Sequence, residues 1–203
     1  MKKILLFMLP ALFFIVSVTD VKGEDFRRKY RNFSFSGMKL MSPDGGGSLD
    51  ANFGAAFTSG RTYFLHSRPI LGLMKIGLDA TWVDLNYSNY TLTAGDAKTP
   101  WHQLEYSLHV GPSVAINPIG KLNINAYFRY APTFSLQYIG GEDISLRGNY
   151  ATMFVTGGMV SWGVIGIGAE YRFGDCNYRN FVGEGAGALD MTGFRTFITL
   201  RFK

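Results

Sequence analysis

Apolar and polar residues alternate strictly over two long neighbouring segments, which are separated only by Asn117-Pro118-Ile119-Gly120. A period of two is typical of a β-strand with one apolar face. Strands of soluble proteins cluster at about 5 to 6 residues, whereas a tilted strand needs about 9 to 11 residues to cross a hydrocarbon core. The apolar positions are Leu104, Tyr106, Leu108, Val110, Pro112, Val114 and Ile116, then Leu122, Ile124, Ala126, Phe128, Tyr130, Pro132, Phe134, Leu136 and Tyr138.

The opposite face of both segments is rich in polar residues, which need water or polar partners. A closed barrel with lipid outside and a polar interior meets that need. The same pattern predicts eight strands along the chain, at residues 32–41, 51–66, 70–87, 102–116, 121–138, 149–160, 164–173 and 192–202.

The predicted connections alternate in length. Three are tight, at residues 67–69, 117–120 and 161–163, and four are longer and polar, at 42–50, 88–101, 139–148 and 174–191. Outer-membrane barrels have short periplasmic turns and long external loops. We therefore expect both termini to be periplasmic and the long loops to be extracellular.

Two local features refine this prediction. In the second strand the outward apolar pattern stops after Ser59 and reaches Arg61, which predicts a bulge or the membrane boundary. Aromatic residues are expected at both interfaces. The outer girdle would contain Trp82, Tyr106, Tyr138 and Tyr171, and the inner girdle Phe33, Trp162 and Phe202.

The chain resembles the small eight-stranded outer-membrane β-barrel proteins of Gram-negative bacteria. This resemblance implies an all-β, antiparallel, up-and-down transmembrane barrel, with outer-membrane lipid and lipopolysaccharide as partners; we expect a monomer. In such proteins the barrel-insertion machinery recognises an alternating last strand that ends in an aromatic residue. The matching residues are Phe194, Thr196, Ile198, Leu200 and Phe202, and Lys203 makes the aromatic residue penultimate.

The first residues have the three parts of a secretory signal peptide: Met1-Lys2-Lys3, an apolar run over 4–18 and a polar stretch. We expect a signal peptide at 1–23, cleaved after Gly23, with an uncleaved anchor as the alternative. A short periplasmic segment at 24–31 and the barrel at 32–203 would follow. The basic residues of segment 24–31 suit a solvated tail or a position near anionic head groups. Cleavage lowers the net charge from +5 to +3, which does not indicate nucleic-acid binding.

Continuing the alternation inward places charges of both signs in a lumen that side chains can fill. Pairing Ile116 with Leu122 sets His109 opposite Arg129, with Asp79 completing the cluster. Pairing Phe173 with Thr192 sets Glu170 against Arg195, with Arg172 and Glu105 at similar height. Such charges must pair, as a structural plug or as a gate in a narrow ion path. The inward set is Lys75, Asp79, Glu105, His109, Arg129, Glu170, Arg172, Arg195 and Arg201.

The sequence contains few motifs that are typical of enzymes or of metal sites. The sequence has no His-Glu-x-x-His, Gly-x-Ser-x-Gly or Cys-x-x-Cys, so we predict no catalytic residue, cofactor or metal site. His102 lies near the outer interface, where some small barrels place the histidine of a lipid acyltransferase or deacylase. Cys176, the only cysteine, is expected in the fourth external loop and open to labelling. A structural or surface-interaction barrel is favoured; a narrow channel for small or apolar solutes and a lipid-modifying enzyme are the alternatives.

Overall fold

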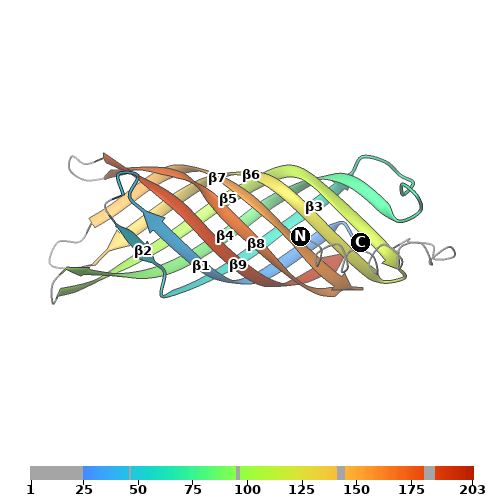
Figure 1. Cartoon of the computed structure of the whole chain (residues 1–203), viewed down its shortest axis with the longest axis horizontal. Coiled ribbons are helices and arrows are strands. Elements are labelled where there is room, and N and C mark those ends of the chain that lie inside the picture. Colours follow the sequence, from blue (N-terminus) through green and yellow to red (C-terminus); the bar gives the residue numbers. More distant parts are fainter. Residues whose placement is uncertain (1–24, 46, 95–96, 141–144, 181–185) are drawn as a thin grey trace, which may run out of the picture.

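The computed structural model describes residues 25–203, except 46, 95–96, 141–144 and 181–185; the predicted signal peptide lies outside these residues. One antiparallel sheet closes into a ring (Figure 1), because β1 pairs with β3 on one side and β9 on the other. The all-β barrel prediction is confirmed. Its strands are β1 (Lys29–Met41), β3 (Phe53–Phe64), β4 (Met74–Ala94), β5 (Ala97–Ile119), β6 (Leu122–Ile139), β7 (Ser145–Trp162), β8 (Ile165–Asn180) and β9 (Ala186–Phe202). A short additional strand, β2 (Ser48–Asp50), pairs with the end of β1.

The strands are tilted strongly against the barrel axis. Following directly paired residues once around the ring from Lys29 leads through Val110 and Thr192 to Lys39, ten positions further along β1. With about 3.3 Å per residue and about 4.8 Å between strands, this stagger over eight strands corresponds to a tilt of roughly 40°. The barrel is therefore narrow, and inward side chains from opposite walls meet.

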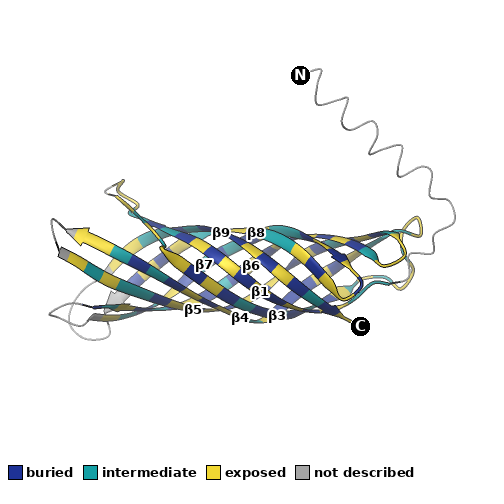
Figure 2. Cartoon of the chain, turned by 90° about the horizontal axis from the view of Figure 1, so that it is seen from below, coloured by how far each residue is buried: buried dark blue, intermediate teal, exposed yellow. Residues whose placement is uncertain are grey.

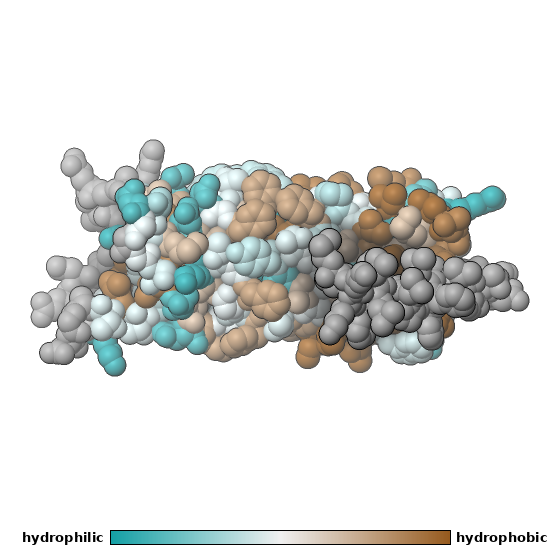
Figure 3. Space-filling model, viewed as in Figure 1, coloured by the Kyte–Doolittle hydropathy of each residue, from teal (hydrophilic) through white to brown (hydrophobic). Residues whose placement is uncertain are grey.

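Burial alternates along the strands, as Figure 2 shows for the whole barrel. In β6, Tyr127, Arg129 and Ala131 are buried, while Phe128 and Tyr130 are exposed. The outward residues over the middle of the barrel form an apolar band. On the face shown in Figure 3, hydrophilic residues gather toward the end that carries β2, and hydrophobic residues toward the opposite end.

The C-terminus and the turns after β5 and β7 lie at one end of the barrel, here called the turn end (Figure 1). The opposite end, which carries β2, is called the loop end. Several strands continue further toward the loop end than predicted: β4 reaches Ala94, β5 starts at Ala97 and β8 reaches Asn180. At the turn end, β1 begins at Lys29, three residues before the predicted start.

Two predictions about local geometry have clear outcomes. The bulge expected near Ser59 is confirmed, because the pairing of β3 with β4 shifts between Ser59 and Gly60. The outer-girdle position of Trp82 is wrong: this residue lines a hollow together with Lys29 and Phe202, at the turn end. Because β4 continues to Ala94, Trp82 lies in its lower half instead of near its top.

Within the residues that the structure describes, no helix is long and apolar enough to span a membrane.

Candidate functional site: the charged lumen

Seven charged side chains from five strands project into the middle of the barrel, and each residue has at most 3% of its surface exposed. Strand tilt and narrow bore bring them together although they are far apart in sequence. We call this set the charge layer. It contains the carboxylates of Asp79, Asp84, Glu105 and Glu170 and the guanidinium groups of Arg129, Arg172 and Arg195.

The part of the charge layer nearer the turn end, here called its lower part, is built around Asp79 and Arg129. Nε of Arg129 lies 3.2 Å from Oδ1 of Asp79, and its guanidinium carbon is 3.5 Å from the centre of the Tyr127 ring. The Tyr30 hydroxyl donates a hydrogen bond of 2.5 Å to Asp79, and Thr62 donates one of 3.1 Å. Asp79 therefore has three different kinds of partner, which offsets the cost of burying a carboxylate.

A continuous chain of ion pairs crosses the centre of the lumen. Nη1 of Arg195 donates to Glu170 at 3.1 Å and to Asp84 at 2.8 Å. Nε2 of His109 lies 3.1 Å from Oδ2 of Asp84, and Arg129 lies 4.0 Å from Glu170. One arginine thus joins carboxylates from β4 and β8 across the bore.

The upper part of the charge layer is the pair of Arg172 and Glu105. Nη1 of Arg172 donates to Oε2 of Glu105 at 2.7 Å. Gln103 and Asn86 also donate to this carboxylate, at 2.5 Å and 3.2 Å. Both oxygens of the Glu105 carboxylate are hydrogen-bonded, and the donors come from β4, β5 and β8. The pair of Glu105 and Arg172 therefore links opposite sides of the barrel.

Of the expected cluster of Asp79, His109 and Arg129, the pair of Asp79 and Arg129 is confirmed, and the position of His109 was wrong. Glu170 and Arg195 pair as expected, because Phe173 is opposite Thr192. In the other hairpin, however, Ile116 pairs with Ile124 and not with Leu122. The Asn117 side chain donates to the carbonyl groups of Gly120 and Leu122, which closes the turn in this register. His109 therefore faces Asp84 and not Arg129.

Asp84 was missed because β4 contains a bulge between Thr81 and Asp84. An added residue reverses which positions point inward, so Asp79, Thr81 and Asp84 are all buried. The sequence carries the signal: the apolar positions change from even to odd numbers at the adjacent pair Trp82-Val83.

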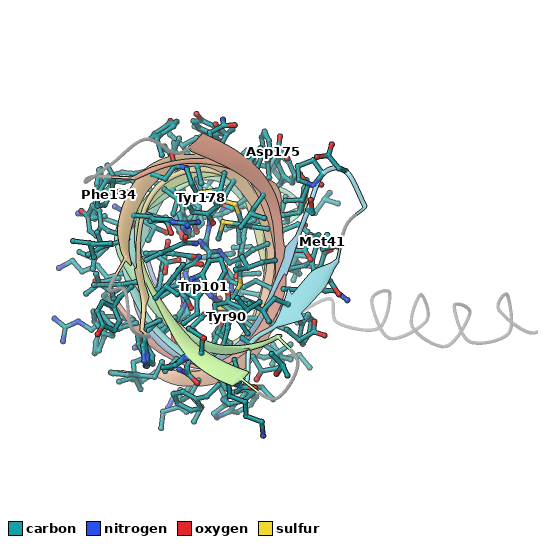
Figure 4. The ribbon with its side chains drawn as sticks, turned by 90° about the vertical axis from the view of Figure 1, so that its left-hand side faces the viewer. Met41, Tyr90, Trp101, Phe134, Asp175 and Tyr178 are labelled. Atoms are coloured by element: carbon teal, nitrogen blue, oxygen red, sulfur yellow. The ribbon has the colours of Figure 1, made fainter. Side chains whose placement is uncertain are left out.

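Above the charge layer, toward the loop end, most inward side chains are apolar, and the buried amides of Gln103 and Gln137 are hydrogen-bonded to each other among them. We call this region the apolar mouth. Figure 4 looks into it and shows Tyr90, Trp101 and Tyr178 inside the ring, while Asp175 lies outside. The Tyr178 hydroxyl contacts the sulfur of Met191 at 3.9 Å, and the Gln103 amide approaches the same sulfur at 3.9 Å. Its buried members are Met38, Leu40, Tyr90, Met153, Cys176, Tyr178 and Met191, with Leu49, Trp101 and Leu189 packed against them.

Cys176 is therefore not in an external loop. It lies in β8 with 0% of its surface exposed and pairs with Ala151 and Leu189. The prediction of an accessible thiol was wrong because β8 and β9 continue as a paired ladder beyond Phe173 and Thr192.

The remaining predicted residues lie outside the charge layer. Lys75 lies 4.9 Å from the centre of the Phe26 ring, and Arg201 donates to the Arg27 carbonyl at 2.7 Å. His102 is on the outer surface, where its ring is hydrogen-bonded to the Tyr87 hydroxyl at 2.7 Å. No group of side chains suited to a metal ion occurs in the described part of the chain. The last-strand residues Phe194, Ile198 and Phe202 are exposed on the outer face, and Leu200 is half-buried.

The fold is similar to that of solved outer-membrane proteins. Ail, the attachment invasion locus protein of Yersinia pestis, solved with the heparin analogue sucrose octasulfate, matches with a TM-score of 0.55 at 9% identity, over 87% of this chain and 100% of that chain. Neisserial surface protein A matches with a TM-score of 0.48 at 12% identity, over 86% of this chain and 97% of that chain. No protein-family model and no curated protein sequence matches. The likeness to Ail shows that this chain has the fold of the small outer-membrane β-barrels.

Proposed function

We propose that this protein is an integral outer-membrane barrel with a closed lumen and a structural or surface-interaction role. The observation that carries the proposal is the charge layer. Arg129, Arg172 and Arg195 extend into the bore and pair with carboxylates on other strands. A conducting path would need these side chains to move apart, which leaves buried charges without partners and costs several kcal/mol per ion, of the order of 3 to 5 for one broken pair.

The apolar mouth supports the same conclusion. Met38, Met153 and Met191 are each at most 2% exposed, although the bore opens toward the loop end just above them. Hydrated ions entering from the loop end would have to pass these packed methionines before they reach the charge layer. A region of this kind resists wetting and opposes ion entry.

The outer surface supports membrane insertion and an exposed loop end. Phe128, Phe134 and Phe194 are about half exposed and belong to the apolar outer band, which would contact lipid acyl chains. Beyond it, β4 and β5 continue as a hairpin with exposed or half-exposed polar residues such as Thr93, Lys98 and Thr99. We propose that this hairpin projects from the cell surface, with both termini in the periplasm, and provides the surface for binding to lipopolysaccharide or a host molecule.

Conductance across a planar bilayer tests the closed lumen. Purified protein, shown to insert by vesicle flotation, should give no discrete current steps above the lipid background. A control variant, Lys98→Ala, changes an exposed charge away from the lumen and should behave identically. Regular steps of one size from the wild-type protein would contradict the closed lumen and favour the narrow-channel alternative.

The orientation is tested with two single-cysteine proteins on a Cys176→Ser background. Thr93→Cys places a thiol at the loop end, and Leu71→Cys places one at the turn end, where Leu71 is 92% exposed. A membrane-impermeant maleimide should label only Thr93→Cys on intact cells. Labelling of Leu71→Cys alone would reverse the orientation.

A further inference from the structure

Three cationic side chains gather on the outer surface at the turn end. Lys29 and Arg31 come from β1, and Arg61 comes from β3. They surround a hollow of about 560 Å³, which we call the cationic pocket. The same hollow is lined by Tyr30, Ser59, Gly60, Tyr63, Trp82 and Phe202.

The cations of the pocket lack compensation from the protein. Lys29 and Arg61 are directly opposite each other on paired strands, and Arg31 is opposite Ser59. Like charges in this position destabilise a sheet. Among the described residues, no carboxylate lies within ion-pair distance of any of the three, while Asp25 nearby pairs with Arg27 and Lys203. An anion from outside that occupies the pocket would relieve this repulsion.

Aromatic rings hold the guanidinium groups in place. Arg61 lies 5.2 Å from the centre of the Tyr63 ring, and Arg31 lies 5.8 Å from that of Phe202. Nε of Arg61 is buried and has no hydrogen-bond partner. A guanidinium group with free donors is well suited to phosphate oxygens, which it can bind at two points.

A separate apolar groove begins next to the pocket on the outer wall. Two residues beyond Arg31, Phe33 begins a groove of about 900 Å³ that runs across β9, β8, β7 and β6. Its floor is a row of directly paired small residues: Thr196, Ala169, Gly158 and Ala126. Its lower edge is the parallel row Ile198, Ile167, Val160 and Ile124. A cationic pocket next to an apolar groove matches a molecule with an anionic head and an acyl chain.

We propose that the cationic pocket binds the phosphate head group of an anionic phospholipid, one acyl chain of which lies in the adjoining groove. This inference rests on the proposed membrane insertion. The aromatic rim favours a membrane lipid over a free anion, because Tyr63, Trp82 and Phe202 are between 38% and 55% exposed and such rings prefer the level of the head groups. Basic pockets at this level recognise phospholipid head groups.

Quenching of Trp82 by brominated lipids tests the proposal. The sequence has three tryptophans, so the changes Trp101→Phe and Trp162→Phe leave Trp82 as the single fluorophore. The protein is reconstituted in phosphatidylcholine vesicles that contain a small fraction of brominated phosphatidylglycerol or, separately, brominated phosphatidylcholine. We expect the anionic lipid to be enriched at Trp82 by at least about fivefold, the effect of one cation near a membrane surface.

A charge variant and a matched control identify the cations responsible. Lys29→Gln, Arg31→Gln and Arg61→Gln together should make both lipids quench equally. Lys39→Gln with Lys98→Gln removes exposed cations at the loop end and should keep the preference. Heat-modifiable migration reports folding of each variant. If the triple variant does not fold, Arg31→Gln alone should still weaken the enrichment measurably.

The remaining outcomes separate the two proposals. Failure of the wild-type protein to float with vesicles contradicts the proposed function itself. Insertion with equal quenching by both lipids contradicts only the lipid site. If glycerol phosphate in the buffer removes the preference at a concentration that does not alter the vesicle surface charge, the pocket is a site for a soluble anion, and the assignment to a lipid is overturned.

Discussion

The charge layer and the apolar mouth occupy the same bore and are built by the same strands, yet their contents are opposite. In β8, Glu170 and Arg172 point inward below, and Cys176 and Tyr178 point inward above. The outer face changes in the opposite sense, from Ile167 to the exposed Asn177. On this strand, the lumen is charged where the outer face is apolar, and the inward residues are apolar where the outer face is polar.

This reversal indicates that the outer face of the two regions is in contact with different surroundings, lipid around the charge layer and water around the apolar mouth. Beside lipid, the inner face collects the polar groups that the outer face excludes. Beyond the lipid, the barrel behaves as a soluble β-protein, with an apolar core and a polar surface. The level at which the pattern reverses, near Phe173 and Gly174 in β8, therefore marks the end of the apolar outer band toward the loop end on this strand.

The largest expected effect breaks the charge layer at its centre. Arg195→Ala removes the arginine that Asp84 and Glu170 share and leaves them only His109 and the more distant Arg129 as charged partners. Loss of one member of a buried ion-pair network should lower the free energy of unfolding by about 3 to 5 kcal/mol, as measured by urea unfolding in liposomes. Thr196→Ala is the control, because Thr196 is the next residue of β9 and lies exposed on the outer face. A loss below about 1 kcal/mol, the value for an exposed pair, would show that water solvates the layer.

A change in the apolar mouth should cost less. Met191 is completely buried, and Met191→Ala should destabilise by about 2 kcal/mol, the low end for truncating a buried methionine, because the cavity lies near the open end. Asp190→Ala on the outer face should change stability by no more than about 0.5 kcal/mol. Equal effects in the same urea unfolding experiment would mean that the mouth is hydrated and not a packed core.

The coupling between Glu105 and Arg172 measures how dry the boundary between the two regions is. The pair is joined at 2.7 Å just below the mouth. A double-mutant cycle of Glu105→Gln and Arg172→Met should give a coupling energy of about 1 to 3 kcal/mol. Additive effects, which correspond to a coupling energy near zero, would show that water reaches the boundary and screens the pair.

The smallest effect concerns accessibility and leaves stability unchanged. Cys176 in the folded barrel should resist an impermeant maleimide and react only after urea is added, because it is fully buried. Asn177→Cys on a Cys176→Ser background places the thiol on the exposed face one residue further, and this protein should react at once. Rapid reaction of wild-type Cys176 would show that the mouth opens in the native state.

Sequence reasoning was most successful where the barrel wall faces an apolar surround. There the alternation is strong, and the strands around Leu108, Phe128 and Ile198 are in place. It failed where the polarity of the two faces reverses. The prediction searched for strands with apolar residues on the outward positions. Beyond Phe173 the apolar residues are on the inward positions instead, so this part of the strand was interpreted as a loop and Cys176 was misplaced.

Within the lumen, the kinds of charge were predictable, but only some of the partners were. The pair Glu170 and Arg195 was predicted correctly because the assumed pairing of Phe173 with Thr192 is the observed one. His109 was assigned to Arg129 because the contacts of Asn117 in the turn are not visible as a pattern. Tyr30 was missed because the predicted first strand begins at Asn32. The hydrogen bond from Tyr30 to Asp79 also depends on Gly60, because a side chain at position 60 would occupy the space of the Tyr30 ring.

The seam between β1 and β9 has a consequence for how the barrel assembles. The two strands pair along their length, from Lys29 with Phe202 to Met41 with Asp190, so these contacts join residues about as distant in sequence as the barrel allows. Closing so long a loop is entropically expensive and slow. Every other strand pair can form between neighbours along the chain, and the seam should be the last to form. Until then both edge strands expose unpaired backbone groups, and a chaperone or the insertion machinery that occupies one edge would control the rate of folding.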